Sequence, residues 1–161
     1  MIPPEVLEFY KNKDCLVTGG TGMIGRHVVD ILVNHGARVV DASLDWSGLN
    51  EGSEHECVDL TDSLFVCLGL TKRMDCVFHV AGLKGSVKAT HERPTDFYAP
   101  ILMMNTNVLE ACRVNKVPNV VYVSSIGAYA EAPFDKLQEI FGRQGDPMDY
   151  YPGMAKRAGE I

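Results

Sequence analysis

Short runs of apolar, largely β-branched residues alternate with longer segments of helical periodicity along most of this 161-residue chain. The strand candidates are the segments CLVTGG, ARVVDAS, HECVDL, DCVFHVAG and PNVVYVSSIG, which begin at residues 15, 37, 55, 75 and 118. Parallel strands need long crossover connections, and the helical segments between these runs supply them. The alternation therefore predicts a doubly wound α/β fold, a parallel sheet with helices on both faces.

Three segments have the apolar spacing of amphipathic helices, and they cover residues 23–36, 63–74 and 96–115. In the first of them Ile24, Val28, Ile31 and Leu32 recur at helical spacing, so we expect these residues to form its apolar face. No internal repeat and no change of composition marks a second domain. We therefore expect one domain over residues 1–161.

Gly19, Gly22 and Gly25 stand in the spacing G-x-x-G-x-x-G between the first predicted strand and the first predicted helix. The first glycine allows a tight turn, the second lets backbone N–H groups approach a pyrophosphate, and the third lets the helix pack close to the strand. The helix N-terminus adds partial positive charge toward the phosphates. A glycine turn used only for packing is the alternative. We predict a dinucleotide-binding loop that also contains Thr21, Met23 and Ile24.

The end of the second predicted strand should carry the residues that contact the adenosine ribose. Asp41, Ser43 and Asp45 lie at alternate positions and share one face if the strand continues that far. An acid at this place selects NAD, whereas a cation would accept the 2′-phosphate of NADP. No Lys or Arg occurs in residues 39–56, which favours NAD. NADP stays open through Arg26 and Arg38, and a solvated strand end is the alternative for either aspartate.

Charge and hydropathy exclude several classes of partner. The chain has 21 Asp and Glu against 15 Lys and Arg, a formal net charge of −6, and its cations are scattered. This distribution argues against a nucleic-acid partner. No apolar run reaches the roughly 18 residues of a membrane helix, and the N-terminus lacks the features of a signal peptide. We therefore expect a cytoplasmic protein with neither a nucleic-acid nor a membrane partner.

The five cysteines cannot all pair, and none has C-x-x-C spacing. Four of them lie in apolar segments such as CLVTGG and MDCVFHV, so we expect buried free thiols. The five histidines also lack the spacing of metal ligands. We predict no metal site.

The chain from about Asp14 to its last residue resembles the extended short-chain dehydrogenases/reductases, the NAD(P)-dependent nucleotide-sugar epimerases and dehydratases. The resemblance is carried by VTGGTGMIG, VDLTD, VFHVAGLKG, MMNTNVLEAC, VVYVSSIGAY and AKRAGE, in the family's order and at similar intervals. The segment that begins with RPTDFYAP looks most like the branch acting on GDP-linked 4-keto-6-deoxy sugars, the fucose synthases. Where that branch has a cysteine for epimerisation, this chain has Ile126 and Gly127.

The resemblance implies further contacts with the cofactor. Asp59 and Leu60 would flank the adenine ring, and Asn107 would face the cofactor from the long helix, unless it is an ordinary polar helix position. Lys84 would reach a substrate phosphate, with a solvated loop lysine as the alternative. The residues that would lie along the ribose and the phosphates are Val80, Ala81 and Gly82.

The resemblance also implies a catalytic group. Ser125, favoured over Ser124, would hydrogen-bond the reacting oxygen, and Lys156 would hold the nicotinamide ribose. A tyrosine moves the proton in this chemistry when its pKa, about 10 in solution, is lowered by a lysine ammonium and the oxidised nicotinamide. The family's tyrosine stands four residues before the lysine, but Pro152 occupies that position here. Since proline suits the first helical position, we expect Tyr151 to precede the helix and to replace the missing tyrosine.

Two functions follow from this combination. The first is an NAD(P)-dependent enzyme, oxidoreductase or isomerase, that acts on a nucleotide-activated sugar, with a homodimer or higher oligomer as its expected assembly. The second is a non-catalytic dinucleotide-binding module or sensor that lacks the proton-transfer tyrosine. Family members are about twice as long, and their C-terminal part builds the sugar site. We therefore expect this chain to be the N-terminal, cofactor-binding part of a longer protein, with the fifth strand exposed as a sheet edge.

Overall fold

The computed structural model describes residues 2–48, 50–131 and 145–161. Its five-stranded sheet has the order β3-β2-β1-β4-β5, and all four neighbouring pairs are parallel. The strands are β1 (Asp14–Thr18), β2 (Arg38–Ser43), β3 (Glu54–Cys57), β4 (Cys76–His79) and β5 (Asn119–Tyr122). The described helices are α1 (Pro4–Tyr10), α2 (Gly25–Asn34), α3 (Leu64–Thr71), α4 (Val87–Glu92), α5 (Thr95–Asn115), the 3-10 helix η1 (Ile126–Ala128) and α7 (Tyr150–Ala158). The predicted doubly wound α/β fold is confirmed.

The chain divides into two compact units, which are described separately. The first unit comprises Met1–Ala81 and Asn107–Val123, and it contains the whole sheet. The second unit comprises Gly82–Thr106 and Ser124–Ile161. Helix α5 begins in the second unit and ends in the first. Composition gives no sign of this division, because both units are built from ordinary amphipathic elements.

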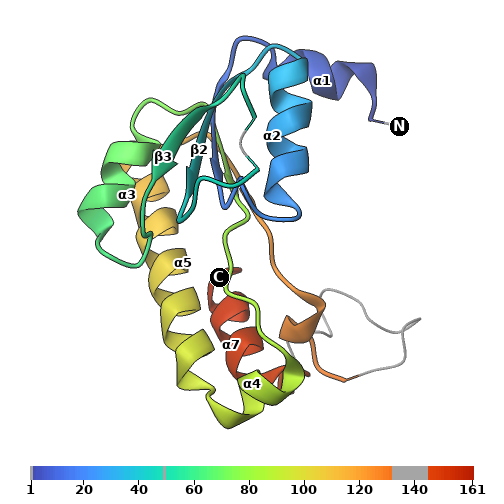
Figure 1. The fold of residues 1–161 in the computed structure, drawn as a ribbon, viewed down its shortest axis with the longest axis vertical. Helices are drawn as coiled ribbons and strands as arrows, with labels where there is room; N and C mark the ends of the chain where they lie inside the picture. Colours follow the sequence, from blue (N-terminus) through green and yellow to red (C-terminus); the bar gives the residue numbers. More distant parts are fainter. Residues whose placement is uncertain (1, 49, 132–144) are drawn as a thin grey trace. The chain divides into compact units, whose positions relative to one another are not determined.

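In the first unit α2 and α3 lie on opposite sides of the sheet (Figure 1). On the α2 side, side chains from β1, β2 and β4 pack against Val29 and Leu32 of the helix. We expected Ile24 and Ile31 on the buried face, but both are exposed. That part of the prediction was wrong because the buried face runs through Gly25, Val29 and Leu32; the predicted Leu32 is on it and Val28 packs beside it. The spacing of apolar residues narrows the choice of the buried face of a helix, but it does not fix how the helix is rotated about its axis.

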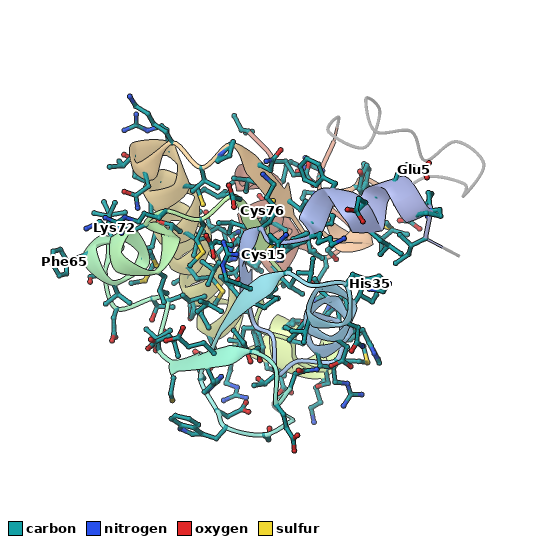
Figure 2. All side chains as sticks on the ribbon, turned by 90° about the horizontal axis from the view of Figure 1, so that it is seen from above. Glu5, Cys15, His35, Phe65, Lys72 and Cys76 are labelled. Atoms are coloured by element: carbon teal, nitrogen blue, oxygen red, sulfur yellow. The ribbon has the colours of Figure 1, made fainter. Side chains whose placement is uncertain are left out.

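The cysteines follow the sequence prediction of buried thiols. Four of the five are buried, namely Cys15, Cys67, Cys76 and Cys112, whereas Cys57 is exposed. Figure 2 shows Cys15 and Cys76 side by side in the centre of the first unit, where they are register partners on adjacent strands. Burial raises the pKa of Cys15 to about 12 and the pKa of Cys67 and Cys112 to about 11. These thiols therefore stay protonated and unreactive near neutral pH.

Strand β5 ends the sheet, as predicted, and Val120 and Val121 on it are exposed. An open hollow of about 480 Å³ lies beside it, lined mainly by the C-terminal turns of α5 and the following loop. On α3, Phe65 points outward from the sheet (Figure 2). None of the described helices is both long and apolar enough to span a membrane. Within the described ranges, no group of three or more His, Cys, Asp or Glu side chains could hold a metal ion.

The second unit has its own small core. Phe97 and Ile101 of α5 pack against Ala155 of α7, with Ala89, Tyr98 and Leu102 around them. Asn105, also on α5, is buried and donates from Nδ2 to the carbonyl oxygen of Ala155 at 3.1 Å. These contacts hold α7, the helix that carries Lys156, against the N-terminal half of α5.

Candidate functional site

Gly19 and Gly25 of the glycine-rich loop form the tight turn and the close helix–strand contact that the spacing predicts. Gly19 has a φ of 72°, which favours glycine, and its N–H donates to the carbonyl oxygen of Ala42 at 2.8 Å. A Cβ at Gly25 would lie 2.0 Å from the carbonyl oxygen of Gly19, so only glycine lets α2 start so close to β1. Gly22 is exposed, and its N–H donates to the same carbonyl at 3.0 Å. The loop is thus built as a tight turn followed by an exposed helix entry.

The predicted loop residues Thr21, Met23 and Ile24 occupy different environments. Met23 is 75% exposed and Ile24 is 51% exposed, which places two large apolar side chains in solvent at the entry to α2. Thr21 is half-buried, and its backbone N–H donates to Oγ of Ser43 at 3.2 Å. Thr21 therefore ties the glycine loop to the end of β2.

Asp41 lies beneath the loop, where it is 2% exposed. A Cβ on Gly20 would come within 2.3 Å of its Oδ1, so a glycine without a predicted function makes room for this carboxylate. The Ser43 hydroxyl donates to Oδ1 at 2.7 Å, and Nδ1 of His55 lies 3.2 Å from Oδ2. Two of the three predicted ribose-contacting residues, Asp41 and Ser43, are thus buried and hydrogen-bonded within the protein.

Asp45 lies outside β2, which ends at Ser43, so the face that we expected to continue to Asp45 stops short of it. Its carboxylate is exposed and accepts from the backbone N–H and the hydroxyl of Ser47 at 2.9 and 2.6 Å. The bond from the Ser47 hydroxyl is the main reason that the pKa of Asp45 is lowered. Asp45 remains a carboxylate at the carboxyl edge of the sheet, where ligands of α/β proteins bind.

The residues expected around the adenine, Asp59, Leu60 and Asn107, are brought together although they are distant in sequence. Oδ1 of Asp59 accepts from the backbone N–H and the hydroxyl of Thr61, both at 2.8 Å. Nδ2 of Asn107 donates to the carbonyl oxygen of Leu60 at 2.9 Å. Asn107 thereby fixes the turn that carries Asp59 and Leu60, instead of being an ordinary solvent-exposed helix position.

Val80 and Ala81 follow β4 and are held by Thr18 at the end of β1. Their backbone N–H groups donate to Thr18, from Val80 to its carbonyl oxygen at 3.2 Å and from Ala81 to its Oγ1 at 3.3 Å. The same Oγ1 lies 2.7 Å from Nδ1 of His79, which is fully buried. Sequence reasoning missed Thr18 and His79 as organising residues, because a polar side chain in an apolar run reveals its partner only in the fold.

In the second unit Ser125 is the N-cap of η1. Its Oγ accepts from the N–H of Gly127 at 3.2 Å. The neighbouring Ser124 donates its hydroxyl to Oε1 of Glu160. The two serines are therefore distinguished by their partners: Ser124 is joined to the end of the chain, and Ser125 caps the next short helix.

Helix α7 starts earlier than the sequence predicted. It begins at Tyr150 with Asp149 as its N-cap, so Pro152 is the third helical residue and Tyr151 lies inside the helix. Our expectation that Tyr151 precedes the helix was wrong, because proline is tolerated throughout the first turn, where its missing N–H has no partner to lose. Tyr151 is 45% exposed, and its ring packs edge-on against Tyr150 with centroids 5.2 Å apart. On this helix it points about 100° away from the direction of residue 152.

Lys156 lies one turn from Pro152 on the same helix. Burial, and secondarily the charge of Lys84, lowers the pKa of Lys156 to about 8. A Cβ on Gly82 would approach its Nζ to 3.4 Å, so Gly82 and Lys84 both lie near this ammonium group. The positive charge of Lys84 thus disfavours the charged form of Lys156.

The serine segment and α7 are joined by contacts that the motifs do not reveal. A Cβ on Gly153 would lie 2.3 Å from the carbonyl oxygen of Gly127, so the two backbones touch. Nε of Arg157 donates to the carbonyl oxygen of Ala128 at 2.9 Å. These contacts hold the Ser125 segment against the helix of Lys156, and the only sequence signal for them is the placing of a glycine in each segment.

Comparison with known proteins places these features in one family. The family model described as "NAD dependent epimerase/dehydratase family" matches residues 15–161. Among curated proteins, GDP-mannose 3,5-epimerase 1 of Oryza sativa subsp. indica is 30% identical over 156 residues, which are 89% of this chain and 40% of that protein.

Solved structures agree with this result. UDP-N-acetylglucosamine 4-epimerase from Methanobrevibacter ruminantium M1, solved with UDP-N-acetylmuramic acid, is 28% identical with a TM-score of 0.79, over 93% of this chain and 49% of that one. UDP-glucose 4-epimerase of Thermus thermophilus, solved with NAD, is 28% identical with a TM-score of 0.76, over 91% and 48%. The chain spans less than half the length of these proteins. With the family model matching nearly its whole length, the chain belongs to the NAD dependent epimerase/dehydratase family.

Proposed function

We propose that this chain is the NAD-binding part of an enzyme that epimerises, dehydrates, oxidises or reduces a nucleotide-activated sugar. The observation that carries the proposal is the glycine loop, in which Gly19 and Gly25 bring the entry of α2 against the end of β1. Exposed backbone at a helix entry binds phosphate through N–H groups and the helix dipole. Membership of the family supports the assignment of the phosphates to NAD.

The second unit supplies the groups for proton transfer in this proposal. NAD, when bound, supplies an acceptor for hydride from the sugar. Ser125 would donate a hydrogen bond to the reacting oxygen, and Tyr151 would accept the proton that leaves that oxygen. Lys156, whose pKa is lowered to about 8, would be mostly charged near neutral pH and would stabilise the tyrosinate.

The binding step is tested first on the 161-residue chain. Titration of NAD by isothermal calorimetry, with the fluorescence of Trp46 as a second readout, should show saturable binding that is tighter than that of NADP. Trp46 is the only tryptophan and lies just past β2. Absence of heat and of a fluorescence change with both cofactors would contradict the proposal.

The proton-transfer step needs the protein expressed from its complete reading frame, together with a nucleotide sugar that it converts. Tyr151→Phe should lower kcat by about a hundredfold or more, because removal of a general acid–base group typically costs 10²–10⁴-fold. Tyr150→Phe is the matched control, since its ring packs on Tyr151 and is similarly exposed. Equal rates for wild type and Tyr151→Phe would exclude Tyr151 from proton transfer.

A second candidate function is favoured by the start of α7. Pro152 stands at the tyrosine position and Tyr151 is committed to a different direction of the helix. A protein that binds NAD but has no proton-transfer group would act as a dinucleotide-binding module or sensor. NAD binding by both proteins, with turnover of a UDP- or GDP-linked sugar by a Pro152→Tyr variant and none by wild type, would support this alternative over the enzyme.

Several finer assignments belong to the same proposal. The substrate would be a nucleotide sugar, as for the relatives solved with UDP-linked ligands. The assignment to the branch acting on GDP-linked sugars, the homodimer or higher oligomer and the cytoplasmic location stay predictions. Size-exclusion chromatography with light scattering tests the assembly, and a panel of UDP- and GDP-sugars tests the branch.

A further inference from the structure

A buried histidine in the first unit has one ring nitrogen without a partner. His55 lies on β3 as the register partner of Asp41 on β2, so both side chains lie on the same face of the sheet. The side chain of His55 is only 5% exposed. Its Nε2 is buried and has no hydrogen-bond partner among the residues that the structure describes. An unpartnered buried polar atom of this kind is rare and indicates a missing partner.

The hydrogen bonds around Asp41 define which ring nitrogen of His55 carries the hydrogen. Because the N–H of Thr21 donates to Oγ of Ser43, the Ser43 hydroxyl is free to donate to Oδ1 of Asp41. A carboxylate only accepts, so Nδ1 of His55 donates its hydrogen to Oδ2 at 3.2 Å. In the neutral ring Nε2 is then a bare lone pair. The atom without a partner is thus an acceptor that needs a hydrogen-bond donor.

Trp46 packs against the ring that carries this acceptor. Its indole packs against the imidazole of His55 with ring centroids 4.6 Å apart and an angle of 61° between the planes. The tryptophan itself is 66% exposed and lies in the loop just after β2. Movement of this one exposed side chain would therefore make room for a ligand beside the His55 ring.

We propose that Nε2 of His55 accepts a hydrogen bond from a hydroxyl of the adenosine ribose of NAD, and that binding moves the indole of Trp46 off the histidine. The inference rests on the proposed NAD binding and deepens it. Asp41 and Ser43 are already hydrogen-bonded within the protein, so the acceptor function passes from β2 to His55 on β3. The 2′-phosphate of NADP would replace a hydroxyl donor and bring negative charge toward a lone pair backed by the Asp41 carboxylate. His55 thereby selects NAD.

Two substitutions of His55 distinguish the function of the Nε2 acceptor from that of the hydrogen bond between Nδ1 and Asp41. In His55→Asn the amide nitrogen reaches about as far as Nδ1, so the bond to Asp41 is kept and the Nε2 acceptor is lost. In His55→Gln the amide oxygen reaches about as far as Nε2, so an acceptor is kept and the bond to Asp41 is lost. Calorimetry measures the affinity of each protein for NAD, for NADP and for nicotinamide mononucleotide, which has no adenosine. Thermal denaturation checks that each variant folds.

The expected result is specific to the adenosine end. His55→Asn should weaken NAD binding about tenfold, the worth of one hydrogen bond, and leave the mononucleotide and NADP unchanged. His55→Gln should retain more of the preference for NAD over NADP than His55→Asn does. In wild type the fluorescence of Trp46 should respond to NAD and not to the mononucleotide.

Other outcomes overturn the inference in distinguishable ways. If wild type binds NAD and His55→Asn binds it equally well, the inference fails and the proposed function stands. Equal weakening of NAD and of the mononucleotide in His55→Asn would reduce His55 to a structural residue and also overturn it. If wild type binds neither NAD nor the mononucleotide, the proposed function fails as well.

Discussion

The two units of this chain differ in how fully they satisfy the family motifs that they contain. The glycine loop of the first unit has the tight turn at Gly19 and the close backbone contact at Gly25 that its spacing requires. In the second unit Ser125 and Lys156 of the family's catalytic group are present, but Pro152 stands inside α7 at the position of its tyrosine. The contrast teaches that nucleotide binding depends on backbone geometry, which is compatible with many different side chains. Proton transfer depends on one side chain in one direction.

The largest effect should come from Gly25→Ala in the first unit. The added methyl group would lie 2.0 Å from the carbonyl oxygen of Gly19, so α2 must move away from β1. We expect the free energy of unfolding to fall by about 3 kcal/mol and NAD binding to weaken by at least about a hundredfold. Urea denaturation and calorimetry measure the two quantities.

Two further glycines serve as controls for that prediction. Gly69 lies in α3, and nothing lies within 4 Å of the place that an added methyl group would take, so Gly69→Ala should stabilise the protein by about 0.5–1 kcal/mol. Gly153→Ala, where the methyl would meet the carbonyl oxygen of Gly127, should disturb α7 and leave the glycine loop intact. An equal change in the free energy of unfolding for Gly25→Ala and Gly69→Ala would contradict the close contact at Gly25 in the first unit.

A smaller loss of stability should follow from replacing either of two asparagines on α5, each of which acts in a different unit. Asn105 bonds Ala155 in the second unit, whereas Asn107 bonds Leu60 in the first. Each alanine substitution leaves a carbonyl without this partner and should cost about 1–3 kcal/mol. Hydrogen exchange should accelerate in α7 for Asn105→Ala and around Asp59 and Leu60 for Asn107→Ala. The same exchange pattern in both variants would show that the bonds are not local to their units.

Loss of a helix cap should have a still smaller effect in each unit. Ser125 caps η1 and Ser63 caps α3, where its Oγ accepts from the N–H of Val66 at 3.4 Å. Ser125→Ala and Ser63→Ala should each lower the free energy of unfolding by about 1 kcal/mol. In the protein with turnover, only Ser125→Ala should also reduce kcat. A similar loss of kcat in Ser63→Ala would remove the argument for a special function of Ser125.

The last expected effect is confined to alkaline pH and comes from Lys156. Folding lowers the pKa of Lys156 from 10.5 to about 8, mainly through burial. Between these values the unfolded chain binds more protons than the folded one, so this group makes stability rise with pH across that window. The penalty is complete below the folded pKa, where both states are charged. Lys156→Met should abolish this part of the rise, measured by urea denaturation at a series of pH values.

Lys84→Met sharpens the same prediction. Lys84 is the second cause of the lowered pKa of Lys156, so its removal should move that pKa upward and narrow the window. Nuclear magnetic resonance of methylated lysines would follow the titration directly. An unchanged Lys156 titration in Lys84→Met would mean that burial alone accounts for the lowered value.

Most of the fold could be predicted because strands and helices here have clear periodicity. All five strands and the helices at 23–36, 63–74 and 96–115 were expected from alternating apolar runs, and the parallel direction of the strands follows from the crossovers. The buried face of α2 was mispredicted at Ile24 and Ile31, since spacing leaves the rotation of a helix open. The start of α7 was mispredicted because Pro152 fits several positions of a first helical turn.

The sequence by itself determined the sheet, the glycine loop and the family, because these depend on local spacing and on residue types that few other folds combine. Only the tertiary structure decided which polar groups meet: Asp41 with His55, Asn107 with Leu60, and Gly153 with Gly127. The two hydrogen bonds join residues that are 14 and 47 positions apart in the sequence. Their partners are set by strand register and helix rotation, which a linear pattern does not encode.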